Sequence, residues 1–102
     1  MVVHEDIIKA VAKTASFFPI KSVAYFGSYA EGKQTDKSDL DVLVEFEKPS
    51  VSLLLLSAVK LELENNLKIP VDVIHAPLPK NALIKPKKVV QVYGTAGQDF
   101  VN

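Results

Sequence analysis

The most informative part of this sequence is residues 27–46, which read GSYAEGKQTDKSDLDVLVEF. The first dozen residues are mostly small or polar and include two glycines, so we expect a loop that holds at most one helical turn. From Asp39 to Phe46 the residues alternate with a period of two, which predicts a strand with one buried face. That face is expected to carry Leu40, Val42, Val44 and Phe46, and the opposite face Asp39, Asp41, Leu43 and Glu45.

Asp39 and Asp41 lie two positions apart in this predicted strand. Side chains at positions i and i+2 of a strand point to the same side of the sheet, so the two carboxylates should project together. Neighbouring carboxylates repel each other, and a divalent cation relieves that repulsion. Oxygen ligands that leave positions for water and phosphate suit Mg²⁺. The pair is therefore a candidate magnesium site, although a lone Asp-x-Asp is more often a solvated strand face.

Gly27, Ser28 and Asp72 are the other candidate site residues. Gly27 and Ser28 directly follow a run of β-forming residues, 20–26. A glycine lets the backbone approach a ligand closely, and N–H groups at a strand-to-helix turn bind phosphate oxygens. Asp72 lies in a later predicted strand, and three carboxylates can hold two metal ions for phosphoryl or nucleotidyl transfer. The simpler alternatives are an ordinary turn for Gly27-Ser28 and, for Asp72, an edge-strand charge that discourages aggregation.

The rest of the chain predicts an α/β fold, with a small mixed β-sheet and helices packed against it. An amphipathic helix is expected over residues 1–18, ended by Pro19, with a buried face of Ile7, Ile8, Val11, Ala12 and Ala15. A second helix should run from an N-cap at Ser50 to about Asn66. Strands are expected at 71–74 and 89–93, and one helical turn at 81–84. We expect a single domain over residues 1–102, with an ordered core of about 3–94.

The second predicted helix, residues 50–66, carries more leucine than one core-facing stripe needs. Two explanations remain open. Either the helix is buried between the sheet and the first helix, or one face meets a partner protein or a second copy of the chain, giving a hetero-oligomer or a homodimer.

Composition excludes several classes of function. The 102 residues include 12 basic and 12 acidic side chains, and every basic one is lysine. A domain with no net charge is a poor candidate for binding long nucleic acid, because the phosphate backbone requires surplus positive charge on the protein. With no cysteine there is no disulfide framework or thiolate metal site. No apolar run is long enough to span a membrane, and the first residues lack the positive charge of a targeting peptide, so we expect a cytoplasmic protein.

Taken together, Gly27-Ser28, ten intervening residues, Asp39-x-Asp41 and a strand-borne Asp72 resemble the signature of the nucleotidyltransferase superfamily typified by DNA polymerase β and kanamycin nucleotidyltransferase. The short chain resembles the minimal nucleotidyltransferase (MNT) proteins, often the antitoxin of a HEPN/MNT toxin–antitoxin pair. The resemblance covers roughly residues 5–75 and implies a polymerase β-like fold.

The resemblance also implies roles for the site residues. Gly27 and Ser28 would hold the β- and γ-phosphates of ATP, and Asp39 and Asp41 would bind Mg²⁺, with two ions in the site. Asp72 would share the catalytic metal and help to deprotonate the incoming hydroxyl. The implied reaction transfers AMP from ATP to a tyrosine hydroxyl of a HEPN-type partner toxin, in a type VII-like toxin–antitoxin system.

One departure from the family pattern concerns the charge beside the phosphates. Relatives commonly read G-S-x-A-R-G after the first strand, whereas this chain has Glu31 at the arginine position. Lys33 or Lys37 would have to supply the missing cation, and Lys33 is the expected phosphate-binding residue. The departure keeps a second hypothesis open, in which the chain neutralises its toxin by complex formation without catalysis. A small-molecule nucleotidyltransferase ranks last, because the chain has no room for an acceptor-binding domain.

Overall fold

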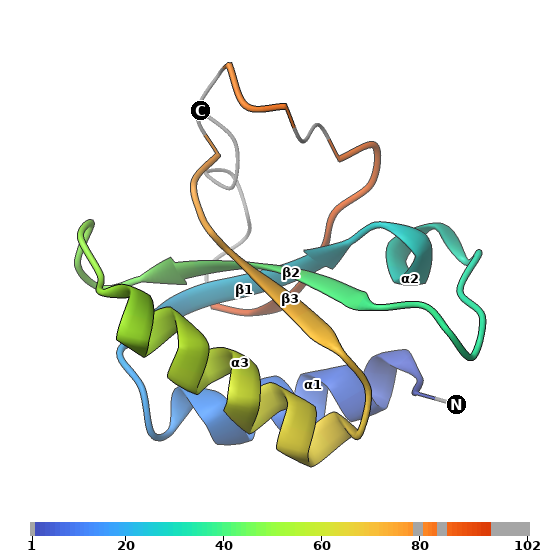
Figure 1. The fold of residues 1–102 in the computed structure, drawn as a ribbon, viewed down its shortest axis with the longest axis horizontal. Coiled ribbons are helices and arrows are strands. Elements are labelled where there is room, and N and C mark those ends of the chain that lie inside the picture. Colours follow the sequence, from blue (N-terminus) through green and yellow to red (C-terminus); the bar gives the residue numbers. More distant parts are fainter. Residues whose placement is uncertain (1, 79–80, 84–85, 95–102) are drawn as a thin grey trace.

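A computed structural model of the chain describes residues 2–78, 81–83 and 86–94 (Figure 1). The elements in chain order are α1 (His4–Ala15), β1 (Ile20–Phe26), α2 (Ser28–Glu31), β2 (Leu40–Phe46), α3 (Leu53–Leu67), β3 (Val71–His75) and β4 (Val90–Tyr93). The α/β class is confirmed. The helical turn expected within the loop after β1 is α2. None of the described helices is both long enough and apolar enough to cross a membrane.

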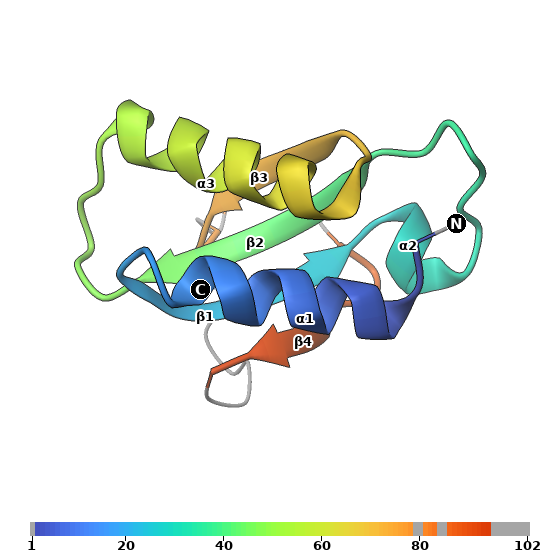
Figure 2. The same cartoon turned by 90° about the horizontal axis from the view of Figure 1, so that it is seen from below.

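The four strands form one mixed sheet in the order β3-β2-β1-β4. β1 is antiparallel to both β2 and β4, and β2 is parallel to β3. A parallel pair needs a crossover connection, which α3 provides. Helices α1 and α3 lie side by side on one face of the sheet (Figures 1 and 2). This arrangement leaves the carboxyl-bearing positions of β2 and β3 on the other face.

The predicted burial of β2 side chains is confirmed on the face that packs against the helices and is wrong on the opposite face. Leu40, Val42, Val44 and Phe46 all lie in the main core, as expected. Leu43, on the opposite face, is also fully buried, in a second cluster with Ala24, Phe26, Ala76 and Leu78. The chain after β3 passes over that face (Figure 1) and covers it. An alternating pattern cannot show that a distant segment returns to bury the second side.

Helix α1 ends at Ala15, three residues earlier than predicted, and its buried face is rotated. Ile7 and Val11 are buried as expected, but so are Ala10 and Thr14, while Ile8 is 38% exposed. The buried stripe tolerates a threonine because its Oγ1 donates to the carbonyl oxygen of Ala10, 2.8 Å away. The predicted burial of Ala12 is also wrong.

Helix α3 begins later than predicted and leaves part of its leucine surface in solvent. Its N-cap is Ser52, not Ser50, and the Ser52 hydroxyl accepts a 3.0 Å hydrogen bond from the backbone N–H of Leu55. The core-facing residues Val59, Leu63 and Leu67 are buried. The fully buried alternative is wrong for three residues, which are largely exposed: Leu53 (82%), Leu54 (80%) and Leu61 (58%).

The last part of the chain is described in pieces. The predicted strand at 89–93 is β4, one residue shorter at its start. Of the helical turn expected at 81–84, residues 81–83 are not helical, and residue 84 lies outside the described residues.

Candidate active site

The parallel register of β2 and β3 places Asp41 directly beside Asp72. The register begins where the N–H of Leu40 donates to the carbonyl oxygen of Pro70, at 3.0 Å. Leu40 and Val71 both point into the core under the helices. The residues that follow them therefore point to the opposite face. Two of the three predicted carboxylates, Asp41 and Asp72, therefore lie side by side on that face. The simpler explanation of Asp72, a lone charge on an edge strand, does not account for this pairing.

The structure gives the Asp41 carboxyl an unusual environment. Partial burial raises its pKa above the ordinary value of 3.8, and the nearby charges of Asp72 and then Asp39 raise it further. Polar interaction between the side chains of Asp41 and Asp72 also raises the pKa of Asp41. Neighbouring carboxylates repel each other when both are ionised, and a cation bound between them relieves that repulsion. The pattern predicted Asp39 as the main neighbour of Asp41, but Asp72 has the stronger effect.

The Gly27 turn packs directly against this carboxyl group. Gly27 has a positive φ of 75°, and a Cβ atom placed on it would collide with Oδ2 of Asp41. The turn leads into α2, where the Gly27 carbonyl oxygen accepts from the N–H groups of Ala30 and Glu31. The N–H groups at the start of a helix have no partner within it, so those of Ser28 and Tyr29 are available to an anion. The predicted phosphate turn and carboxylates are therefore adjacent.

Asp39, Lys33 and Glu31 lie further out. Asp39 is exposed just before β2 and acts on Asp41 through its charge. The Lys33 ammonium lies 3.6 Å from Oε1 of Glu31, so the expected phosphate-binding lysine is paired with the residue that replaces the family's arginine. Neither residue lines the cavity beside Asp41 and Asp72.

That cavity has a volume of about 640 Å³ and is lined by Phe26, Asp41, Lys60, Asp72, Val73 and Ile74. Sequence reasoning missed Lys60. Its ammonium donates to the carbonyl oxygen of Val71 at 2.6 Å and lies 3.2 Å from Oε2 of Glu64. The i, i+4 spacing of Lys60 and Glu64 indicates an ion pair on a helix, but nothing local indicates that this helix borders the strand that carries Asp72.

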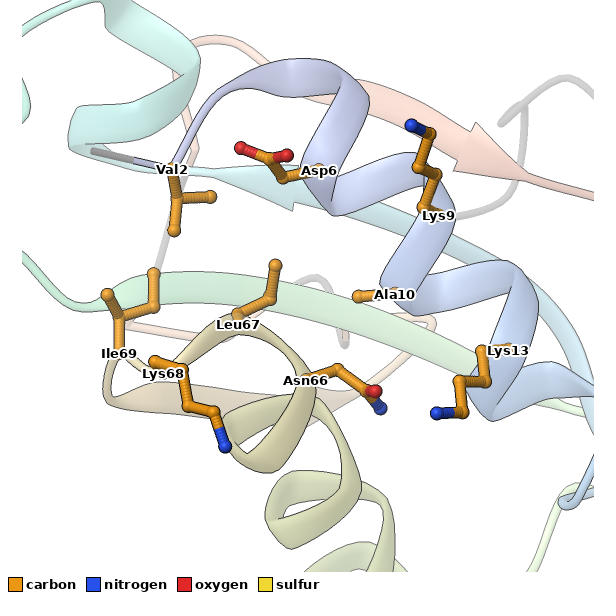
Figure 3. A pocket seen from close by; sticks show the side chains of 9 residues that line it. All are labelled: Val2, Asp6, Lys9, Ala10, Lys13, Asn66, Leu67, Lys68 and Ile69. Atoms are coloured by element: carbon orange, nitrogen blue, oxygen red, sulfur yellow. The ribbon is translucent and has the colours of Figure 1, made fainter.

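A separate pocket of about 610 Å³ lies between α1 and the C-terminal end of α3 (Figure 3). Its lining residues are Val2, Asp6, Lys9, Ala10, Lys13, Asn66, Leu67, Lys68 and Ile69. Asp6 supplies the one carboxylate in this lining, and its Oδ2 accepts from the N–H of Val3. The pocket is on the helix side of the sheet and has no carboxylate pair, so the chemistry of the cavity beside Asp41 is absent there.

Mg²⁺ is the metal that the sequence implies. Within the described ranges, no group of three His, Cys, Asp or Glu side chains is arranged as a ready metal site. Asp41 and Asp72 nevertheless fit a divalent cation, because the parallel register brings two oxygen-donor groups side by side, where a cation would relieve their repulsion. Asp39 adds negative charge nearby.

The raised pKa of Asp41 predicts how stability depends on pH. Without metal, the folded state holds the Asp41 proton more tightly than the unfolded state, whose pKa is near 3.8. The free energy of unfolding therefore falls as pH rises from about 4 through the higher folded pKa. Asp41→Asn should stabilise the metal-free protein at pH 7 by about 0.5–1 kcal/mol, since like charges side by side cost that much at a partly exposed site.

Urea unfolding in EDTA between pH 4 and pH 7 measures this effect. The gain from Asp41→Asn should shrink towards pH 4, and Asp36→Asn, at an exposed loop position, should give no gain. Equal stability of the wild type and Asp41→Asn across this range would contradict the raised pKa.

Comparison with known proteins identifies the family of this chain. The family model of the nucleotidyltransferase domain matches residues 5–94. A protein of Methanocaldococcus jannaschii, named a candidate protein adenylyltransferase, is 41% identical over 69 residues. That alignment covers 68% of this chain, and the chain spans slightly less than two thirds (65%) of the relative's length.

Two solved structures share the fold. One is a crystal structure of a toxin–antitoxin with AMP-PNP, with a TM-score of 0.67 and 23% identity over 89% of this chain and 73% of the other. The second is a tri-AMPylated Shewanella oneidensis HEPN toxin in complex with MNT antitoxin, with a TM-score of 0.58 and 20% identity over 89% and 69%. Because the family model matches nearly the whole described chain, this protein belongs to the nucleotidyltransferase domain family.

Proposed function

We propose that this chain is a Mg²⁺-dependent protein adenylyltransferase that transfers AMP from ATP to a tyrosine hydroxyl of a HEPN toxin, and so acts as its antitoxin. The observation that carries the proposal is the contact between Asp41 and Asp72 beside the Gly27 turn. Carboxylates and a phosphate-binding turn are compatible neighbours when the ligand is a metal–nucleoside triphosphate.

In this proposal the Gly27 turn holds the β- and γ-phosphates through the N–H groups at the start of α2 and the Ser28 hydroxyl. These contacts orient the triphosphate so that its α-phosphate faces the cavity lined by Asp41 and Asp72. Because the turn is fixed against Asp41, substrate and carboxylates keep one relative position. Positioning of this kind supplies much of the catalysis in phosphoryl and nucleotidyl transfer.

Asp39, Asp41 and Asp72 would hold Mg²⁺, which when bound neutralises phosphate charge and increases the acidity of the attacking hydroxyl. Asp72 is exposed on the edge strand, so it is the carboxylate that an acceptor reaches first. The tyrosine oxygen forms a bond to the α-phosphorus while the bond from that phosphorus to the bridging oxygen breaks. Pyrophosphate leaves, and Asp72 receives the tyrosine proton.

The partner and the acceptor are proposed by analogy. The M. jannaschii relative is named for protein adenylyl transfer, and the neighbouring structures contain a bound ATP analogue and a HEPN toxin that carries AMP. These names support ATP as the nucleotide and a toxin as the acceptor. A reaction that uses ATP on a toxin is expected to take place in the cytoplasm.

The test is to incubate the chain with its toxin, ATP and Mg²⁺, and to locate the added AMP by mass spectrometry. We expect AMP on a toxin tyrosine, its loss when that tyrosine is replaced by phenylalanine, and its loss in EDTA. Modification that persists in EDTA would contradict the metal requirement, and modification of another residue type would contradict the tyrosine acceptor.

A second candidate function is neutralisation by complex formation alone. The observation that favours it is the exposed leucine face of α3, formed by Leu53, Leu54 and Leu61. Exposed apolar patches on small domains often mark protein interfaces. In this alternative the toxin is silenced when the leucine face binds it, and the carboxylates are not needed.

Binding measurements with variants of the leucine face test this alternative. The double variant Leu54→Asp/Leu61→Asp should weaken toxin binding by about tenfold or more, since burying a charge in an apolar interface is costly. Leu83→Asp is the matched control, because Leu83 is 100% exposed outside α3. If the double variant binds the toxin as tightly as the Leu83→Asp control, the leucine face is not the interface.

A further inference from the structure

Val71, the residue before Asp72, is held from outside the sheet by two side chains of α3. Oε2 of Glu64 accepts from the Val71 N–H at 3.0 Å, and the Lys60 ammonium donates to the Val71 carbonyl oxygen at 2.6 Å. Lys60 and Glu64 are themselves 3.2 Å apart. We name this pair the edge clamp.

The edge clamp occupies a place where backbone groups usually meet water. Among the strands that the structure describes, β3 is at the edge of the sheet, with β2 as its one neighbour. Since the Pro70 carbonyl oxygen bonds towards β2, the N–H and carbonyl of Val71 point away from β2, to the open edge. The clamp satisfies both groups with one ion pair. Its two members are partly exposed, with 42% and 27% side-chain exposure, whereas Val71 is fully buried.

The edge clamp lies next to the position in the sheet where two carboxylates repel each other. Asp41 and Asp72 face each other across β2 and β3, and their charges repel when both are ionised. That repulsion tends to push β3 outward, because no further strand of the described residues lies beyond it. The edge clamp bonds Val71 to α3, one residue before the Asp72 carboxylate. Lys60 also brings a positive charge to the wall of the same cavity.

We propose that Lys60 and Glu64 are positioning residues that hold Asp72 beside Asp41 in the geometry that metal and nucleotide require. The inference rests on the proposed function, because it assigns a role to the same site. A positioning role for Lys60 and Glu64 differs from a purely structural role in one measurable respect. A merely structural clamp affects folding, whereas a positioning clamp sets the affinity of the folded protein for Mg²⁺.

The test compares Glu64→Ala with Glu62→Ala in the full chain. Glu62 is on the same helix, and its carboxylate accepts from Asn66 at 2.9 Å. Among the described residues it makes no hydrogen bond or ion pair with β3. We expect Glu64→Ala to weaken Mg²⁺ binding in the presence of a non-hydrolysable ATP analogue by roughly tenfold, as loss of a group that orients a ligand does. The Glu62→Ala variant should bind as the wild type does. Glu64→Gln, which keeps an acceptor for Val71, should recover most of the loss.

Two further readouts separate positioning from stability. Hydrogen exchange of the Val71 and Asp72 amides should accelerate in Glu64→Ala and not in Glu62→Ala. The kcat for AMP transfer should fall while the KM for ATP stays within about twofold of the wild type, because the Gly27 turn is untouched. If Glu64→Ala does not fold, Lys60→Met makes the same comparison, since it keeps the Glu64 bond to Val71.

The outcomes distinguish the two proposals. If the wild type binds Mg²⁺ and folded Glu64→Ala binds it equally well, the edge clamp does not position Asp72, while the proposed function stands. If the wild type binds no Mg²⁺ with the nucleotide, the proposed function fails, and the positioning role fails with it.

Discussion

Asp41→Asn is expected to slow AMP transfer to the toxin on the order of 10³-fold, the size of effect seen when one preorganised electrostatic group is removed from an active site. Asp41 is the half-buried member of the carboxylate pair, and it contacts both Asp72 and the Gly27 turn. Asparagine keeps the shape of the side chain but lacks the charge and the second oxygen ligand. Single-turnover rates with excess chain over toxin measure the effect on the chemical step.

The control for this variant is Asp36→Asn, which removes a carboxylate from the exposed loop before β2 and should transfer AMP at the wild-type rate. Because Asp41→Asn is also expected to be more stable without metal, its loss of activity cannot be attributed to unfolding. A rate within tenfold of the wild type would place the reaction centre elsewhere.

Gly27→Ala is expected to cost both stability and activity. At a φ of 75° an alanine is strained, and its Cβ would collide with Oδ2 of Asp41. We expect a loss of about 1–3 kcal/mol in the free energy of unfolding. AMP transfer should fall by on the order of 10²-fold, because even a small displacement of a reacting group is costly. Urea unfolding and single-turnover rates measure the two effects.

Gly32→Ala is the control, because it replaces the glycine at the other end of α2. Gly32 also has a positive φ, 72°, but with a ψ of 22° it lies in the left-handed helical region, whereas the ψ of Gly27 is −151°. A Cβ placed on Gly32 meets no atom within 4 Å. Both variants place an alanine at a positive φ, but Gly27→Ala also carries the greater backbone strain of its ψ and the collision with Asp41. If Gly27→Ala loses no more activity than Gly32→Ala, then the close approach of the turn to Asp41 has no role in catalysis.

The sequence predicted those features of the site that depend on local pattern. The period of two around Asp41 placed this carboxylate and Leu40 on opposite faces of a strand, and the structure agrees. Gly27 ends a β-forming run, and its turn lies against the carboxylate as expected. Asp72 was predicted on a strand, and the parallel register brings it beside Asp41.

The features that sequence reasoning missed depend on contacts between distant segments. Leu43 is buried because the chain returns over the sheet after β3, which no pattern within β2 can indicate. Thr14 is buried because its hydroxyl is satisfied within the helix. Lys60 reaches the site because α3 packs beside the edge strand, and that packing is fixed by the whole fold rather than by the residues around Lys60.

The ion pair between Glu31 and Lys33 affects how the glutamate at the family's usual arginine position influences nucleotide binding. Because the two side chains form an ion pair beside the phosphate turn, Glu31 is partly neutralised and Lys33 is partly occupied. Glu31→Gln should therefore release Lys33 and lower the KM for ATP by about two- to threefold, since an exposed ion pair is weak. Steady-state kinetics over a range of ATP concentrations measures this change. An unchanged or higher KM would show that Lys33 does not assist nucleotide binding.

The central claim is that the chain transfers the α-phosphate of ATP, with its nucleoside, to the toxin. Parallel incubations with ATP labelled on the α-phosphate and on the γ-phosphate test it most directly. With Mg²⁺ present, the account predicts that the α-label becomes covalently attached to the toxin and that the γ-label leaves as pyrophosphate. It also predicts that Asp41→Asn transfers neither label. Transfer of the γ-label, or neutralisation of the toxin with neither label attached, would contradict the account.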